Sequence, residues 1–134
     1  MPRIPKDVQE FLVGKKAWVA TADADGMPNT TIKGTVQVID DEHVIFADLF
    51  SRKTRENLRA NPKVAVAVAD EATGKGYQIK GTVEMSDSGA LFEEVAKELK
   101  AAPMDLPPLQ RVVYITVESV FDQSVGPEAG VQIV

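Results

Sequence analysis

Cysteine is absent from the 134 residues, and histidine occurs only once, at His43. The lack of cysteine excludes disulfides, thiolate metal sites and a cysteine nucleophile. With a single histidine, placed in an acidic turn, we expect neither a histidine-based catalytic triad nor a multi-histidine metal site. His43 also lies among Asp40, Asp41 and Glu42, a cluster more typical of a solvated hairpin tip than of a cation site. We therefore expect no metal.

Long apolar runs are also missing, so the sequence predicts no membrane-spanning segment. The first six residues lack the apolar stretch of a signal peptide. No glycine-rich dinucleotide fingerprint follows a predicted strand. The net charge of −5 argues against general nucleic-acid binding. We expect one domain over residues 1–134, in the cytoplasm, without a nucleic-acid or membrane partner.

Hydrophobic periodicity predicts a mainly β chain. Alternating or continuous apolar residues indicate six strands, whereas i, i+3, i+4 spacing indicates short helices. Strands are expected at 15–21, 29–38, 44–48, 64–69, 77–83 and 111–120, and helices near 5–12, after Ser51 and over 87–102. Three prolines make 101–108 an irregular connection. Short antiparallel strands that bury one face can close into a barrel, which removes exposed edges.

Two apolar features carry further expectations. The run from Val64 to Ala69 favours a strand covered on both faces, and Trp18 is expected in the packed core. So small a chain has difficulty covering both faces of such a strand. The surplus apolar surface therefore favours a dimer.

The most informative segment begins where an apolar strand, Ile45 to Ala47, leads to Ser51, Arg52 and Lys53 at the start of a short helix that Pro62 ends. Unpaired N–H groups at a helix start carry partial positive charge, Ser51 or Thr54 can cap that end, and the two cations add full charges. The arrangement suits a phosphate. The simpler alternative is a capped, solvated basic helix.

These residues resemble the pyridoxamine 5'-phosphate oxidase-like family, the FMN-binding split barrels. The resemblance includes a turn, Asp25 to Pro28, the Ser51-Arg52-Lys53 motif with the later Asn61-Pro62, and a strand that ends at Gly81. It covers residues 5 to 130 in order. It implies a six-stranded antiparallel split β-barrel with flanking short helices, which dimerises and builds two FMN sites from both subunits.

The resemblance also implies the cofactor-binding residues. Arg52 and Lys53 match the phosphate-binding pair, with Ser51 and Thr54 as hydroxyl partners. Residues of the second strand would line the ribityl chain and the ring, largely through backbone groups, and two residues of the next strand would contact the flavin. These residues are Thr30, Thr31, Ile32 and Lys33, followed by Phe46 and Ala47.

Departures from the family pattern narrow the function. The true oxidases begin their second-strand motif with Arg and end it with a substrate-binding Lys, at positions where this chain has Thr31 and Val36. The sequence thus predicts a small FMN flavoprotein, an oxidoreductase or electron carrier with a small-molecule or protein redox partner, rather than the vitamin B6 oxidase. An F420-binding reductase and a non-enzymatic flavin-binding module stay open. The C-terminal segment from Phe121 could cover a flavin or be a loose tail.

Overall fold

The computed structural model describes residues 3–34, 36–49 and 51–134. It contains three helices and seven strands within these ranges. The helices are α1 (Lys6–Leu12), α2 (Lys53–Ala60) and α3 (Ala90–Lys100). The strands are β1 (Ala17–Ala22), β2 (Pro28–Lys33), β3 (Gln37–Val38), β4 (His43–Asp48), β5 (Lys63–Asp70), β6 (Lys75–Ser86) and β7 (Arg111–Asp122).

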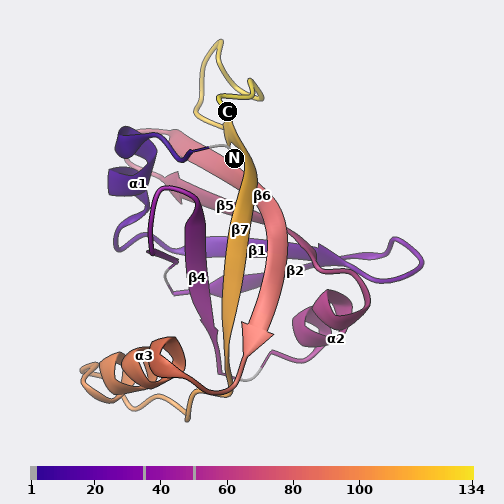
Figure 1. Ribbon diagram of the computed structural model, residues 1–134. Coiled ribbons are helices and arrows are strands. Elements are labelled where there is room, and N and C mark those ends of the chain that lie inside the picture. Colours follow the sequence, from indigo (N-terminus) through magenta and orange to yellow (C-terminus); the bar gives the residue numbers. More distant parts are fainter. Residues whose placement is uncertain (1–2, 35, 50) are drawn as a thin grey trace.

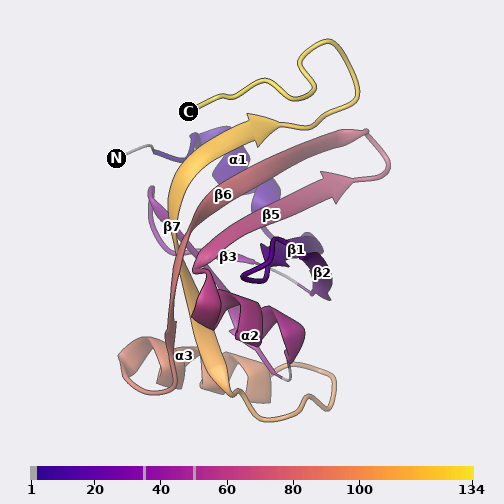
Figure 2. The same cartoon turned by 90° about the vertical axis from the view of Figure 1, so that its right-hand side faces the viewer.

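All seven strands belong to one antiparallel sheet in the order β2-β1-β5-β6-β7-β4-β3. The sheet curls strongly, so that β1 and β2 run across the direction of β6 and β7 (Figures 1 and 2). This confirms the expected mainly β fold, a curled half-barrel with short helices, although with seven strands instead of six.

The additional strand arises because the predicted strand 29–38 is interrupted. Its first part, β2, pairs with β1, whereas its second part, β3, pairs with β4 at the opposite edge of the sheet. Gly34 follows directly after β2, and glycine has no side chain to pack in a strand. The two parts of the predicted strand lie at opposite edges of the sheet.

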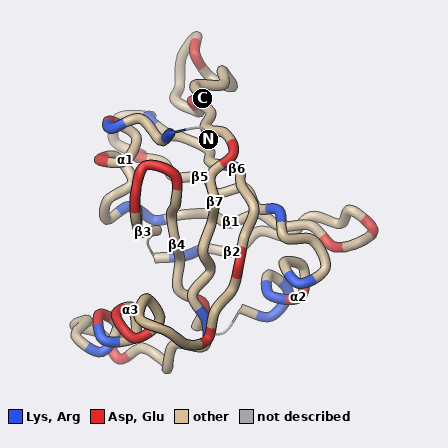
Figure 3. The backbone as a smooth tube through the Cα atoms, in the orientation of Figure 1, with Lys and Arg blue, Asp and Glu red and all other residues tan. Residues whose placement is uncertain are grey.

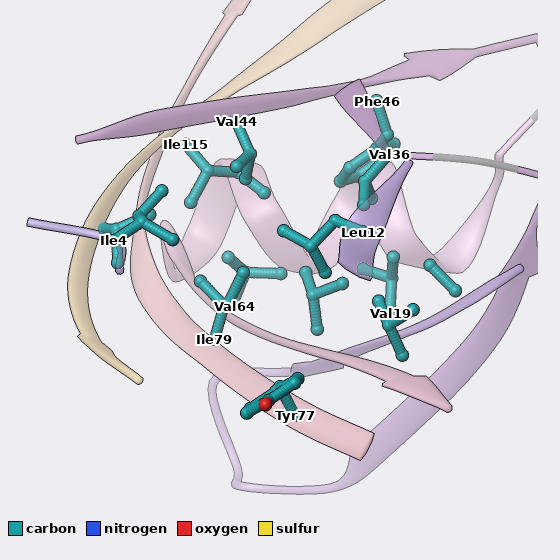
Figure 4. Close-up of a cluster of buried hydrophobic side chains, with 14 of the residues drawn as sticks. Ile4, Leu12, Val19, Val36, Val44, Phe46, Val64, Tyr77, Ile79 and Ile115 are labelled. Carbon is teal, nitrogen blue, oxygen red and sulfur yellow. The ribbon is translucent and has the colours of Figure 1, made fainter. Parts of the chain in front are cut away.

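The inner face of the curled sheet holds the main core, to which Ile4 and Leu12 of the N-terminal segment contribute (Figure 4). Val64, Val66 and Val68 of β5 point inward and are buried, and Leu12 of α1 is fully buried among them. Alternate residues of a strand point to opposite faces, so the three valines give β5 one buried face in the interior of the sheet, between β1 and β6.

The outer face of β5 differs from its prediction. Ala67 and Ala69 are exposed and Ala65 is only partly buried, so the strand is covered on one face within the chain. Trp18 was expected in the core but lies partly buried on this outer face, opposite Ala67. The alternation of β1 requires this, because Ala17 and Val19 take the buried positions.

The remaining elements cover the ends of the sheet. Val95 of α3 packs on the outer side of β4 and β7, against Ile45 and Val112. The C-terminal segment returns to β7 through a bridge between Phe121 and Gln132, so it is not a loose tail, and it lies at the end opposite α2 and α3 (Figure 1). No helix of the described ranges is long and apolar enough to cross a membrane.

Candidate functional site

The turn from β4 into α2 is organised by a buried carboxylate. Asp48 is 1% exposed, and its Oδ1 accepts the backbone N–H of Ser51 at 2.7 Å. Arg52 is the N-cap of α2, and no side chain of the described residues caps the helix. The prediction that Ser51 or Thr54 caps this end is therefore wrong. Both hydroxyls are used elsewhere, since Ser51 Oγ accepts a bond from Lys33 and Thr54 Oγ1 accepts one from Asn29.

Helix α2 is fixed on the barrel by polar contacts to β1 and β2. The side chain of Asn57 is buried and donates to Thr21 Oγ1 at 3.0 Å, and Asn29 Nδ2 lies 3.3 Å from Thr54 Oγ1. Leu58 adds apolar contact with the core. These contacts leave the first turn of the helix at the molecular surface, so its backbone N–H groups are held in place without a side-chain acceptor.

The charged groups at this helix end are accessible. Arg52 and Lys53 are both exposed. Lys53 Nζ lies 4.0 Å from Asp23 and 3.8 Å from Glu56, distances at which exposed ion pairs contribute little. Arg52, Lys53, Arg55 and Arg59 thus gather basic residues at and along α2 in a protein whose net charge is −5 (Figure 3). An anion that binds there would meet the helix dipole and two cations together.

Lys33, the last residue of β2, reaches toward the same turn. Its Nζ donates to Ser51 Oγ at 2.6 Å and lies 5.4 Å from the centre of the Phe46 ring. Burial lowers the pKa of the Lys33 ammonium, and the nearby charge of Asp48 partly opposes that shift. The ammonium is therefore held in a partly dehydrated position beside the α2 turn.

A cavity of about 520 Å³ opens beside Lys33, between strands β2 to β4 on one side and α3 with the following connection on the other. The structure thus brings together four of the ten predicted cofactor residues, Ile32, Lys33, Phe46 and Ala47. Ser51 adjoins this group through Lys33. The other lining residues are Gly34, Gln37, Ile45, Leu49, Val95, Glu98, Leu99, Met104 and Leu106.

The other predicted site residues lie outside the cavity lining. Thr30 is exposed and Thr31 is partly buried on β2, whereas Arg52 and Lys53 lie at the helix start. Thr54 is 3% exposed and its hydroxyl is engaged, so it could offer an anion only its backbone N–H. Phe46 lines the cavity but is 2% exposed, and most of its ring belongs to the core.

Sequence reasoning missed the wall that α3 and the connection after it provide. The sequence predicts a helix over 87–102, which contains Val95 and Leu99, and an irregular connection over 101–108, which contains Met104 and Leu106. A periodic stripe shows that a helix has a buried face but does not show which strand it faces. Only the pairing of β4 with β7 places this wall opposite Ile32.

Comparisons with known proteins give a consistent family. The family model for pyridoxamine 5'-phosphate oxidase matches residues 4–124. An uncharacterized protein of Methanocaldococcus jannaschii is 35% identical over 133 residues, which cover 96% of this chain and 86% of that protein.

Solved structures agree with this match. HupZ of Group A Streptococcus is 31% identical with a TM-score of 0.81, over 95% of this chain and 99% of that one. A pyridoxamine 5'-phosphate oxidase-like protein of Lactobacillus delbrueckii is 25% identical with a TM-score of 0.73, over 90% and 95% of the two chains.

More distant structures share the fold alone. They include an FMN-binding protein of Syntrophomonas wolfei, an F420 reductase and the heme storage protein HutZ of Vibrio cholerae, with TM-scores of 0.70, 0.68 and 0.61 and identities of 19%, 21% and 19%. The fold therefore accommodates more than one kind of cofactor. On the match that spans residues 4–124, this chain belongs to the pyridoxamine 5'-phosphate oxidase family.

Proposed function

We propose that the protein binds FMN and exchanges electrons or hydride with a small-molecule or protein partner. One observation carries the proposal: the uncapped start of α2, with Arg52 and Lys53, lies next to a cavity of about 520 Å³ whose walls are mostly apolar. FMN has the matching parts, a phosphate at one end and a flat ring at the other.

The phosphate would bind at the start of α2. The free N–H groups of the first turn, the planar guanidinium of Arg52 and the ammonium of Lys53 supply charge-assisted donors. Asp48 fixes the turn that presents them, because it holds the backbone of Ser51. These features support a terminal phosphate monoester as the anchoring group.

The ring would enter the cavity along β2. This strand is at an edge of the sheet and pairs only with β1, so half of its backbone polar groups face away from the sheet and are available to a ligand. Ile32 is 62% exposed at this edge, and it lies across the cavity from Met104 and Leu106. Apolar side chains on two sides suit a flat aromatic ring. Bound FMN would supply the redox chemistry, and the protein would anchor and orient it.

Other ligands are weaker candidates. The same basic turn would suit the phosphate-bearing tail of F420, and the site would serve equally well in a flavin-binding protein without turnover. No comparable structural feature favours heme as the ligand of this cavity within the described residues. The only histidine of the sequence, His43, is the first residue of β4, where its Nδ1 is 2.7 Å from Asp40 and its ring stacks on Tyr114.

The first experiment identifies the ligand. Purified protein should be yellow, with absorption near 450 nm that dithionite bleaches, and mass spectrometry after denaturation should detect FMN. Release of F420, or no flavin uptake when the protein is incubated with FMN, would reject the proposal. Steady turnover with a reductant would then separate an enzyme from a binding module.

A variant tests the phosphate assignment. Replacing both Arg52 and Lys53 with Ala should weaken FMN binding about a hundredfold or more, since each of the two charge-assisted bonds is worth about 1.5 to 3 kcal/mol. Riboflavin, which lacks the phosphate, should bind poorly to both proteins. The matched control is Arg59→Ala with Lys100→Ala, which removes two exposed cations at the far ends of α2 and α3. Equal binding of FMN and riboflavin to the unaltered protein would show that the phosphate site is wrongly placed.

A further inference from the structure

Among the residues that the structure describes, Lys33 is the one cation that lines the cavity, and the hydroxyl to which it donates is neutral. Its ammonium donates to the hydroxyl of Ser51 at 2.6 Å, and within the described ranges no carboxylate lies within 4.0 Å of it. A hydroxyl can accept a hydrogen bond but cannot neutralise a charge. The ammonium therefore enters the cavity wall without a direct counter-ion.

The nearest negative charge compensates Lys33 only in part. Asp48 attracts the ammonium, yet burial has the larger effect and lowers the pKa of Lys33. Asp48 is itself buried, and its Oδ1 binds the Ser51 backbone. A cation that has lost water without gaining a full partner can recover that free energy from an anionic ligand.

The rest of the cavity strengthens this effect. Nine of the lining residues are apolar, and the only other charged one, Glu98, is exposed on α3. Apolar walls keep the local dielectric low, so a charge introduced by a ligand interacts more strongly with Lys33 than it would in water.

We propose that Lys33 makes this cavity selective for charge: it binds planar, mostly apolar molecules that carry a negative charge at the edge facing Lys33, and it discriminates against neutral molecules of the same shape. This goes beyond the proposed function, in which the phosphate at the α2 turn anchors FMN and the neutral oxidised ring makes no use of this charge preference. The inference rests on the cavity itself, whichever cofactor the α2 turn anchors. The alternative is that Lys33 only braces the α2 turn through Ser51.

Two fluorescent dyes of one scaffold test the proposal. 1-Anilinonaphthalene-8-sulfonate and N-phenyl-1-naphthylamine share their aromatic body, and only the first carries a sulfonate. The protein without added cofactor should bind the sulfonate dye about tenfold or more tightly than the neutral one, as a charge-assisted hydrogen bond predicts. Lys33→Met should remove this preference and leave the affinity for the neutral dye within about twofold. Lys33→Arg should keep the preference.

Three control variants test whether the dyes bind in the cavity beside Lys33. Lys80→Met removes a lysine that stacks on Phe121, outside the cavity, and should change nothing. Arg52→Ala with Lys53→Ala should keep the preference, because those cations lie at the α2 surface. Leu106→Trp adds bulk to the cavity wall and should weaken both dyes alike. An unchanged preference in Lys33→Met, or its loss in the Arg52 and Lys53 variant, would overturn the proposal.

Failure of this inference and failure of the FMN proposal are distinguishable. If the unaltered protein takes up no FMN, but Lys33→Met removes the dye preference, the charge-selective cavity is supported and the FMN proposal is rejected. If the protein binds FMN but has equal affinity for the two dyes, the FMN proposal is supported and the proposed role of Lys33 is rejected.

Discussion

At the scale of single residues, Lys33 is a charged side chain that the fold partly removes from water. It is half-buried over the Phe46 ring and bonded to a neutral hydroxyl, and burial lowers its pKa. A lysine whose pKa is lower in the folded state binds fewer protons there than in the unfolded state. Keeping it charged therefore costs folding free energy at neutral pH, and that cost disappears as the pH rises toward the unfolded value near 10.5.

We predict that Lys33→Met, a swap of similar length without the charge, melts at the same or a higher temperature than the unaltered protein at pH 7, in the absence of ligand. The advantage should shrink as the pH rises through the lowered pKa of Lys33 toward 10.5. Thermal unfolding followed by circular dichroism over pH 7 to 10 measures it. A variant that melts clearly lower at pH 7 would show that the bond to Ser51 outweighs the cost of burial.

At the scale of elements, the long pair of β6 and β7 bends at Gly81. The register shifts by one residue between Lys80 and Gly81, which marks a β-bulge. A Cβ built on Gly81 would collide with the carbonyl oxygen of Thr116 and lie 2.8 Å from Ile115 Cγ2. The close approach of two backbones explains why only glycine fits at this point. This bend lets the sheet curl around the core.

We predict that Gly81→Ala lowers the free energy of unfolding by about 1 to 3 kcal/mol or more, because the backbone of β7 cannot yield as a side chain would. Gly34→Ala is the matched control. Nothing lies within 4 Å of a Cβ built at Gly34, so its stability should change by less than about 1 kcal/mol. Urea denaturation measures both. Equal effects of the two substitutions would contradict the packing argument.

At the scale of the whole molecule, the outer face of β5 is left exposed to solvent in a single chain. Ala67 and Ala69 are exposed beside Trp18, in the middle of a sheet whose inner face is tightly packed. Small residues allow another backbone or a flat side-chain layer to approach closely. The sequence resemblance predicts a homodimer with cofactor sites built from both subunits, and this face is the one we expect the second copy to cover.

We predict that light scattering at micromolar concentration gives twice the 14.5 kDa mass of one chain. Ala67→Glu should produce the monomer, because it places an unpaired charge in the buried seam. Ala72→Glu, in the exposed turn between β5 and β6, adds the same charge outside the face and should leave the dimer intact. A mass of one chain for the FMN-loaded protein would contradict the dimer.

Most of the elements followed from the sequence because local rules decide them. Pro5 precedes α1, Pro62 follows α2, and the alternation of Val64, Val66 and Val68 with alanines defines β5. The break at Gly34 was missed, since a two-residue strand such as β3 has too little pattern of its own. Helix capping at Ser51 was also wrong, because a distant residue, Lys33, competes for that hydroxyl.

By itself, the sequence determined the mainly β class, the basic start of α2 and the family, because these depend on composition, period and the order of motifs along the chain. The tertiary structure decided how Lys33 meets Ser51 and which residues of α3 face Ile32 across the cavity. Those contacts join segments far apart in the chain, and their geometry depends on how the sheet curls. No local pattern specifies that curl, so the charge environment of the cavity became visible only in three dimensions.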